Sequence, residues 1–479
     1  MSAWRLLVAL LALPVCAVAK RFDFSTYERR PAEWFASDQA RAIAEKLLLY
    51  QHASGGWPKN RDMTLTPAEE VARRGKVPDD ETRPTFDNGA THSQLNFLAC
   101  VVAAGGDADG RFREAFLRGL DYTLAAQYPN GGWPQFYPLR AGYYSRITFN
   151  DGAMVGALEV LHGIATGAAP FAFVDAARRE RCRAAVERGI ECILQCQIVE
   201  NGRRTIWAAQ HDEQTFAPAA ARTFEPAALC SGESAGILRF LMKLEEPSAE
   251  VVAAVEAGVK WLREHAIHGL RCDFVAAPGT TRGFDRVAVA DPNAPSIWAR
   301  FYELGTNRPI FVGRDGVVRY ALHEIEEERR SGYAWYVDWP AAVLNQDYPA
   351  WKQRMNAFTV ANTERKLRPR YPFIARPQVD ATVELSAQED LSYVRRGAET
   401  LCLDVYRPAG KALLPAVLIV HGGGWETGSR EMERPLARAL AARGYVTVPV
   451  SYRLGPSGRF PAALHDLKRA IAWLRARDE

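Results

Sequence analysis

The N-terminal half of the chain repeats one short pattern, a glutamine followed by a Gly-Gly-Trp-Pro loop. The pattern begins at Gln51 and again at Gln127, and a weaker copy runs from Gln195 to Trp207. Each copy ends an amphipathic run whose apolar residues recur every three or four positions, the spacing of one helix face. Repeats of this size bury their apolar faces against their neighbours. The pattern predicts an all-α fold, an α/α toroid whose loops gather at one end to form a cleft.

The helices predicted from this spacing occupy much of the first 265 residues. They are 38–50, 91–104, 112–126, 151–165, 175–196, 232–244 and 251–265. Residues 266–350 are richer in loops and aromatic side chains, and loops on a rigid scaffold are where binding groups concentrate. We therefore expect residues 20–350 to form one toroidal domain.

A different pattern begins near residue 391. Short β-rich runs at 401–408, 416–420 and 446–450 alternate with helical stretches at 431–443 and 461–477. Strands that alternate with helices indicate a parallel α/β sheet. Residues 351–390 combine prolines with dense charge and are predicted to be a linker, followed by a second domain at 391–479.

The second domain carries a glycine motif, His421-Gly-Gly-Gly-Trp425, directly after the predicted strand 416–420. In α/β-hydrolases, glycines at this place let backbone N–H groups, here those of Gly422 and Gly423, turn towards a developing oxyanion. No strand, nucleophile elbow and helix follow before Glu479. An oxyanion loop without a nucleophile cannot transfer an acyl group, so we expect an incomplete and inactive α/β-hydrolase-like domain.

The nucleophile-elbow pattern G-x-S-x-G does occur at 232–236, but far upstream of these features. An elbow needs a strand before the serine, whereas the residues before Ser234 read as a loop. We expect Ser234 to lie at a helix start or in a substrate loop.

The net charge and the N-terminal residues bear on the binding partners and the location of the protein. A formal charge of +4 over 479 residues is too weak and scattered to indicate nucleic-acid binding. A charged start, an apolar run and Ala17-Val18-Ala19 predict a signal peptide at 1–19, cleaved after Ala19. That run is too short to span a membrane, so we expect a periplasmic or secreted monomer. Cys16 leaves a lipoprotein open, although Val15 is bulkier than such a site prefers.

Two similar corners precede predicted helices, Thr85-Phe86-Asp87-Asn88-Gly89 and Thr148-Phe149-Asn150-Asp151-Gly152. Either could be a helix N-cap. Together, Asp87 and Asp151 with their amide neighbours could give calcium three or four of its six to eight oxygens, and substrate carboxylates could complete the shell.

Several arginines lie among aromatic residues and glycines, where a guanidinium needs an anionic partner. Arg222 occupies a loop before a predicted helix, and Arg300, Arg308 and Arg314 cluster along the chain. His211 is either a general base or a satisfied structural histidine.

Tryptophans of the repeat have two possible roles. Trp57 and Trp133 either stack on sugar rings or fill the core of the toroid, and the sequence favours neither.

Seven segments in order resemble the pectate lyases of polysaccharide lyase family 10 over roughly residues 35–345. They are GGWPKN, TFDNGAT, QYPNGGWPQFYPLR, ITFNDGAM, IWAAQHDEQT, ARTFEPAALCSGESAGI and ARFYELGTNRPIFVGRDG. Residues 390–479 resemble the start of an HGGGW-type esterase. The resemblance implies calcium-dependent β-elimination on polygalacturonate, the de-esterified backbone of pectin.

The resemblance also implies roles for residues at the motif positions. Arg222 would abstract the proton, and Asp87 and Asp151 would serve the calcium ion. The substrate would be bound by Lys59, Asn88, Trp133, Arg300 and Arg308.

Two other functions stay open. A non-catalytic pectin-binding module that serves an esterase would bind oligogalacturonate without forming product. A terpenoid-cyclase-like toroid would need an acidic protonating cluster, for which Asp79-Asp80-Glu81 is the candidate.

Overall fold

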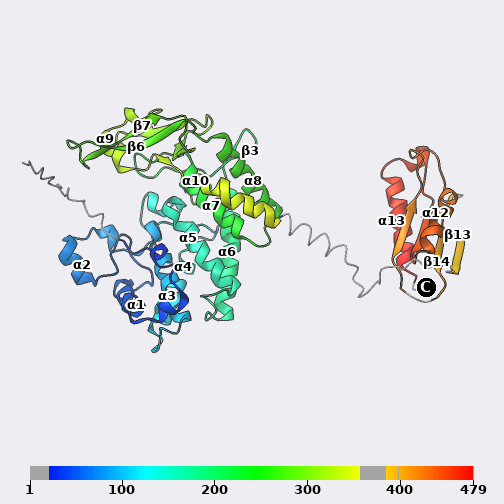
Figure 1. Ribbon diagram of the computed structural model, residues 1–479, viewed down its shortest axis with the longest axis horizontal. Helices are drawn as coiled ribbons and strands as arrows, with labels where there is room; N and C mark the ends of the chain where they lie inside the picture. The colour runs from blue at the N-terminus through cyan, green and yellow to red at the C-terminus, as the bar shows by residue number, and fades with distance from the viewer. Residues whose placement is uncertain (1–20, 356–383, 398, 411–412, 478–479) are drawn as a thin grey trace, which may run out of the picture. The chain divides into compact units, whose positions relative to one another are not determined.

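The computed structural model describes residues 21–355, 384–397, 399–410 and 413–477. The chain divides into two compact units, one up to Asn356 and one from Ala357 (Figure 1). The predicted signal peptide at 1–19 and most of the predicted linker at 351–390 lie outside the described residues. No described helix is both long and apolar enough to cross a bilayer.

Helices of the first unit pack largely as consecutive pairs, α3 with α4, α5 with α6 and α7 with α8. The α-helices are α1 (Asp38–Tyr50), α2 (Pro67–Arg74), α3 (His92–Ala103), α4 (Arg111–Ala125), α5 (Ala153–Thr166), α6 (Ala176–Cys196), α7 (Ser231–Lys243), α8 (Ala249–Glu264), α9 (Glu327–Gly332) and α10 (Trp339–Ala342). Their apolar faces meet in one large core, as expected of helix repeats that cover one another.

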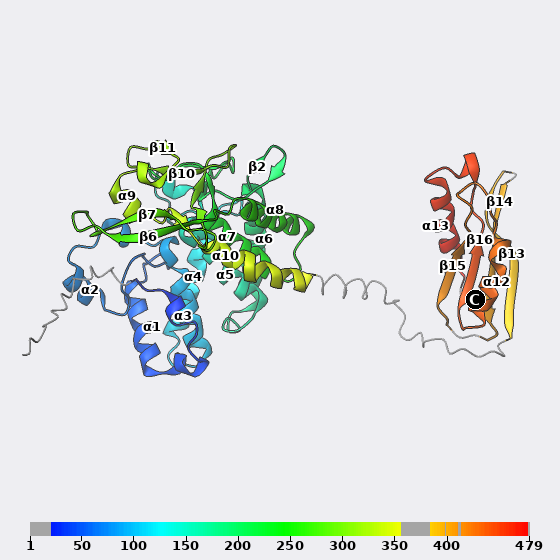
Figure 2. The ribbon, with the colours of Figure 1, turned by 45° about the horizontal axis from the view of Figure 1, so that its top comes forward.

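The prediction of an all-α toroid is wrong, because the first unit also contains several small sheets (Figure 2). Four strands pair in the order β11 (Val318–Arg319), β10 (Pro309–Val312), β9 (Phe301–Tyr302) and β5 (Leu229–Cys230). The two-stranded pairs are β1 (Ile147–Thr148) with β4 (Gln210–His211), β2 (Val199–Glu200) with β3 (Arg203–Arg204), β6 (Leu270–Ala276) with β7 (Phe284–Ala290), and β8 (Trp298–Ala299) with β12 (Tyr336–Val337). Most of these strands have two residues, too few to show the alternation that marks a strand in a sequence.

The repeated glutamine ties each loop to the helices in the same way. The Gln51 side chain donates to the carbonyl oxygens of Gly55, in its own loop, and of Ala115 on α4, both at 2.8 Å. Gln127 makes the same two bonds to its own loop and to α6. Gln197 does so with a third loop and α8. The sequence repeat is therefore a repeat of the same two hydrogen bonds.

Each repeat tryptophan is fully buried, and its indole N–H donates to a backbone carbonyl of a preceding helix. The pairs are Trp57 with Leu47 (2.8 Å), Trp133 with Thr123 (2.9 Å) and Trp207 with Ile193 (2.7 Å). The preceding loops need glycine: Gly131 has φ +91°, and a Cβ there would lie 2.0 Å from the Arg188 carbonyl oxygen.

The second unit is a four-stranded sheet with two α-helices. Its elements are β13 (Leu385–Arg396), β14 (Glu399–Pro408), β15 (Ala416–Val420), α12 (Arg434–Ala441), β16 (Val446–Val450) and α13 (Ala462–Arg475). The strand order is β13-β14-β16-β15, and only β15 and β16 run parallel. The sheet is thus mixed, not parallel throughout as predicted, and β13 begins inside the segment predicted as linker because its polar sequence hides the strand.

Candidate active site

The two predicted Asx corners meet in space. They form the short 3-10 turns η4 (Asp87–Gly89) and η6 (Asn150–Gly152), which contact each other. The middle residue of each turn is left-handed, Asn88 at φ 53° and Asp151 at φ 51°. Asn and Asp tolerate this conformation better than other non-glycine residues. The N-cap alternative fails here, because neither turn makes a side-chain cap bond to the helix that follows.

Asp87 lies at the buried end of this pair of turns, with a side chain that is 4% exposed. Its Oδ2 accepts a 2.8 Å hydrogen bond from Lys59 Nζ, and Lys59 also lies 3.4 Å from Asp80. Its Oδ1 is buried without a hydrogen-bond partner among the described residues. A buried carboxylate oxygen without a donor is costly, so this oxygen is suited to bind a cation.

Asp151 belongs to a crowded group of acids around Arg300. Arg300 Nη2 lies 2.5 Å from Glu233 Oε1, 3.0 Å from Asn150 Oδ1 and 3.9 Å from Asp151 Oδ1. Burial, and next the charge of Asp87, raise the pKa of Asp151 to about 6, although Arg300 opposes the shift. Asp151 therefore lies near other carboxylates, with Arg300 as its ion-pair partner.

Arg222 makes a two-pronged ion pair with Glu225, at 2.7 Å from Nε and 2.5 Å from Nη2. Its guanidinium stacks 4.8 Å from the Phe224 ring. Burial alone would lower the pKa of Arg222, but the hydrogen bonds and charge of Glu225 outweigh it and raise that pKa.

Tyr333 connects Arg222 to the acid cluster. Its hydroxyl donates to Glu225 Oε1 at 2.8 Å, and its ring lies 5.9 Å from the Arg222 guanidinium and 4.6 Å from that of Arg300. One buried aromatic ring thus separates the proposed base from the arginine beside Asp151. Glu225, Glu233 and Tyr333 were not among the residues singled out in the sequence.

The structure does not bring every predicted residue to this cluster. Trp133 is fully buried with no ring face open to a sugar, so we assign it to packing. Arg308 is exposed and stacks 3.7 Å from Tyr320, and no described contact joins its side chain to Arg222 or Asp87. Asn88 lies at the cluster's edge, bonded to Asn60 and Arg21.

His211 and Ser234 are structural. The His211 ring is buried, with Nε2 bonded to the Ala208 N–H (3.1 Å) and Nδ1 to the Phe216 carbonyl (2.8 Å). Burial lowers the pKa of His211 to about 4. Ser234 Oγ is buried and donates to the Cys230 carbonyl at 2.6 Å, which leaves no nucleophile there.

The acidic run at 79–81 is neutralised by cations. Asp79, Asp80 and Glu81 pair with Arg83, Lys59 and Arg74 respectively. Each of the three carboxylates therefore has a cationic partner, and none stands as the free acid that a terpenoid-cyclase-like chemistry needs.

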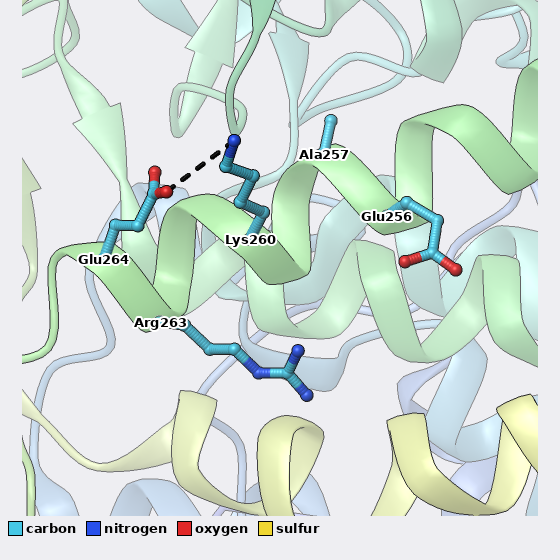
Figure 3. A pocket seen from close by; sticks show the side chains of 5 residues that line it. All are labelled: Glu256, Ala257, Lys260, Arg263 and Glu264. Atoms are coloured by element: carbon cyan, nitrogen blue, oxygen red, sulfur yellow. Dashed lines mark ion pairs between the residues drawn. The ribbon is translucent and has the colours of Figure 1, made fainter.

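A separate pocket on α8 is lined by Glu256, Ala257, Lys260, Arg263 and Glu264 (Figure 3). It shares no residue with the cluster, and its ion pair, Lys260 to Glu264 at 3.7 Å, is an ordinary pair one helical turn apart.

Comparison with known proteins identifies the first unit. Residues 51–344, more than half of the chain, match the family model described as pectic acid lyase. The chain belongs to the pectic acid lyase family. Its first unit is therefore a polysaccharide lyase, with Asp87, Asp151, Arg222 and Arg300 all inside the matched range.

Solved structures agree with this family. The pectic acid lyase chain is 34% identical to Family 10 polysaccharide lyase from Cellvibrio cellulosa, covers 94% of it with 66% of its own length, and gives a TM-score of 0.55. A mutant of that lyase in complex with trigalaturonic acid gives a TM-score of 0.56 at the same identity, with 95% of that chain covered.

The second unit has different relatives. Residues 403–479 match the BD-FAE family model. Over 77 residues the chain is 40% identical to Esterase LipC of Mycobacterium tuberculosis, and this covers 15% of the chain and 19% of that esterase. The pectic acid lyase chain thus spans about a fifth of the length of this esterase.

The predicted oxyanion loop follows β15. Gly423 has φ +119°, and a Cβ there would lie 2.0 Å from the Thr427 carbonyl oxygen, so only glycine fits. Between Glu384 and Arg477, no described serine hydroxyl is hydrogen-bonded to a histidine ring: His421 Nδ1 instead contacts the Gly422 carbonyl at 2.9 Å.

Proposed function

We propose that this pectic acid lyase cleaves de-esterified homogalacturonan by calcium-assisted β-elimination, with Arg222 as the proton-abstracting base, outside the cytoplasm. The single observation that carries the proposal is the connection of Arg222, through Tyr333 and Arg300, to the acids at η4 and η6. The related lyase solved with trigalaturonic acid supports the substrate class.

The reaction removes the proton at C5 of a uronate, next to its carboxylate, and expels the oxygen at C4. The proton is weakly acidic, so positive charge beside that carboxylate must stabilise the enolate-like transition state. Arg222 can accept the proton only while its guanidine group is neutral. The hydrogen bonds and charge of Glu225 instead favour the charged guanidinium. This opposition predicts a rate that rises steeply with pH.

Calcium fits the residues of the two turns. Asp87 and Asp151 offer hard oxygens, and Asp87 Oδ1 is buried without a donor among the described residues. No three acidic, histidine or cysteine side chains among the described residues form a complete metal site. Substrate carboxylates and water would therefore complete the shell, and bound calcium would supply positive charge beside the uronate carboxylate.

The direct test is to incubate the protein with polygalacturonate and calcium and to follow product formation. We expect unsaturated oligogalacturonides, detected by ultraviolet absorbance, at a rate that rises from about pH 7 to about pH 10. A chelator and fully methyl-esterified pectin are the controls. If the polymer binds but no product forms at any of these pH values, the binding-module alternative is correct instead.

Asp87→Ala should raise the calcium requirement and KM, and added calcium should recover part of the rate. The substitution removes an oxygen donor and also frees the Lys59 ammonium from its 2.8 Å partner. Asp79→Ala, which removes an exposed carboxylate paired with Arg83, is the matched control. Calcium titration of the initial rate checks the expectation, and an unchanged calcium requirement in Asp87→Ala would remove Asp87 from the metal site.

For the second unit we propose no esterase activity from the residues present. The oxyanion-type loop at Gly422 and Gly423 stabilises charge only after a nucleophile has attacked, and no described serine of this unit has a histidine partner. We expect p-nitrophenyl acetate to be hydrolysed no faster by the chain than by a Gly423→Ala variant. A clear difference between the two would show a working ester site.

A further inference from the structure

We propose that Arg140, stacked on Tyr144, binds a carboxylate of the polyuronate chain next to the Asp87–Lys59 pair. The proposal rests on the proposed function, because it names a second carboxylate-binding position for the same substrate. It concerns a residue outside the two turns and outside the Arg222 loop.

Backbone bonds fix the loop that carries Arg140 alongside Asp87. Gln135 accepts from the Phe86 N–H at 3.0 Å, one residue before Asp87, and Thr85 forms a bridge with Phe136. The Gln135 N–H donates to the Tyr144 carbonyl at 3.0 Å and closes the loop at its far end. The loop therefore begins and ends at the segment that leads into the acid cluster.

Arg140 shares an aromatic ring with Lys59. Its guanidinium lies 5.5 Å from the Phe136 ring centre and Lys59 Nζ lies 5.4 Å from the same centre. The Tyr144 ring, 5.4 Å from that of Phe136, stacks more closely on Arg140, at 4.1 Å. Two cations thus share one buried ring beside Asp87, and of the two only Lys59 has a carboxylate partner among the described residues.

The other cations of the site already have acidic partners: Lys59 has Asp87, Arg222 has Glu225 and Arg300 has Glu233. Arg140 has no hydrogen bond or ion pair with any described residue, and its Nη1 is buried without a partner. A half-buried guanidinium without an anion has lost hydrogen bonds to water that its stacking on Tyr144 does not replace. Such a group is prepared for an anionic ligand.

The same loop carries a second tyrosine next to Tyr144. The Tyr143 and Tyr144 ring centres are 4.0 Å apart. Burial raises the pKa of Tyr143, and the charge of Arg222 opposes the rise. Arg140 thus lies on a group of aromatic rings beside the Asp87 turn, formed by Phe136, Tyr144 and Tyr143.

A guanidinium recognises a carboxylate through two parallel hydrogen bonds, which lysine cannot reproduce. Polygalacturonate carries one carboxylate on each sugar. A chain with one uronate at the acid cluster therefore presents the next carboxylates to neighbouring positions, of which Arg140 is one. Methyl esterification would remove the charge that Arg140 needs, so this residue also favours de-esterified polymer.

The test measures trigalacturonate affinity by calorimetry, in the full chain with Arg222→Ala present to prevent cleavage. Adding Arg140→Ala should weaken binding by at least about tenfold, and adding Arg140→Lys should give an intermediate value. Arg181→Ala, which removes an arginine paired with Asp121 between α4 and α6, should change nothing. With Arg222 intact, Arg140→Ala should raise KM on polygalacturonate and leave kcat within about threefold.

Affinity for the trimethyl ester of trigalacturonate gives a second measurement. Arg140→Ala should reduce the preference for the free acid over the ester, an effect that general loosening of the loop would not produce. Equal affinity of the Arg140→Ala and Arg140→Gln variants with their parent would overturn the proposal. If the intact chain binds trigalacturonate but does not cleave polygalacturonate, the proposed function fails while the affinity comparison still decides the role of Arg140. If it does not bind at all, both fail.

Discussion

Replacing Arg222 by alanine should lower kcat on polygalacturonate by about 10²- to 10⁴-fold, the usual loss when a general base is removed. Trigalacturonate should still bind, because the lost interaction belongs to the transition state. The measurements are initial rates at saturating substrate and calorimetric binding. A variant that keeps more than about a tenth of the kcat would exclude Arg222 as the base.

Arg222→Lys should not restore the rate. The ammonium places its charge differently and lacks the planar fork that grips both oxygens of Glu225. Thermal unfolding of both variants serves as the control, since Arg222 is partly exposed and its loop should keep its shape. Rescue by lysine would indicate a purely electrostatic role for this position.

The pH profile follows from the same ion pair. Because the pKa of Arg222 is raised, the neutral guanidine is a minor form, and its share grows about tenfold for each pH unit below that pKa. The rate should therefore increase with pH until another group titrates or the fold fails. Glu225 both orients the guanidinium and opposes its deprotonation. A substrate carboxylate in the place of Glu225 would also carry a negative charge, so it would oppose deprotonation in the same way.

The helix repeat was predictable because its pattern lies in residues that are close together in the sequence. Gln51, Gln127 and their Gly-Gly-Trp loops recur at regular places, and each glutamine makes the same two bonds. The short strands were not predictable: β9 has two residues, and its neighbours β5 and β10 are set by tertiary packing.

The candidate site divides in a similar way. The turns at Asp87 and Asp151 have a local signature, two Asx pairs followed by glycine, and the structure places them in contact. The ionic partners around these turns have no local sequence signature, since the pairing of Glu233 with Arg300 joins residues far apart in the sequence. Trp133 shows why the sequence left two roles open, because an aromatic residue in a Gly-Gly loop looks the same in a sequence whether it meets a sugar or the core.

Arg300→Ala should destabilise the first unit by about 3–5 kcal/mol, the cost expected when one partner of a buried ion pair is removed. The side chains of Arg300 and Glu233 are 6% and 3% exposed, and Nη2 lies 2.5 Å from Oε1. Without the guanidinium, the buried Glu233 carboxylate would lose its cationic partner, and the nearby Asp151 would lose its own. Urea unfolding measures the loss, and Arg183→Ala, at an exposed pair with Glu180, should be nearly neutral.

The double variant Arg300→Met with Glu233→Gln separates two contributions to that loss of stability, the uncompensated carboxylate and the lost packing of Arg300. If the penalty of Arg300→Ala comes from the orphaned carboxylate, neutralising Glu233 as well should recover most of the lost stability. Activity should not recover with it, because Arg300 also donates to Asn150 and holds η6 beside Asp87. A double variant as unstable as Arg300→Ala alone would place the cost in lost packing against Tyr333 and Trp339 rather than in uncompensated charge.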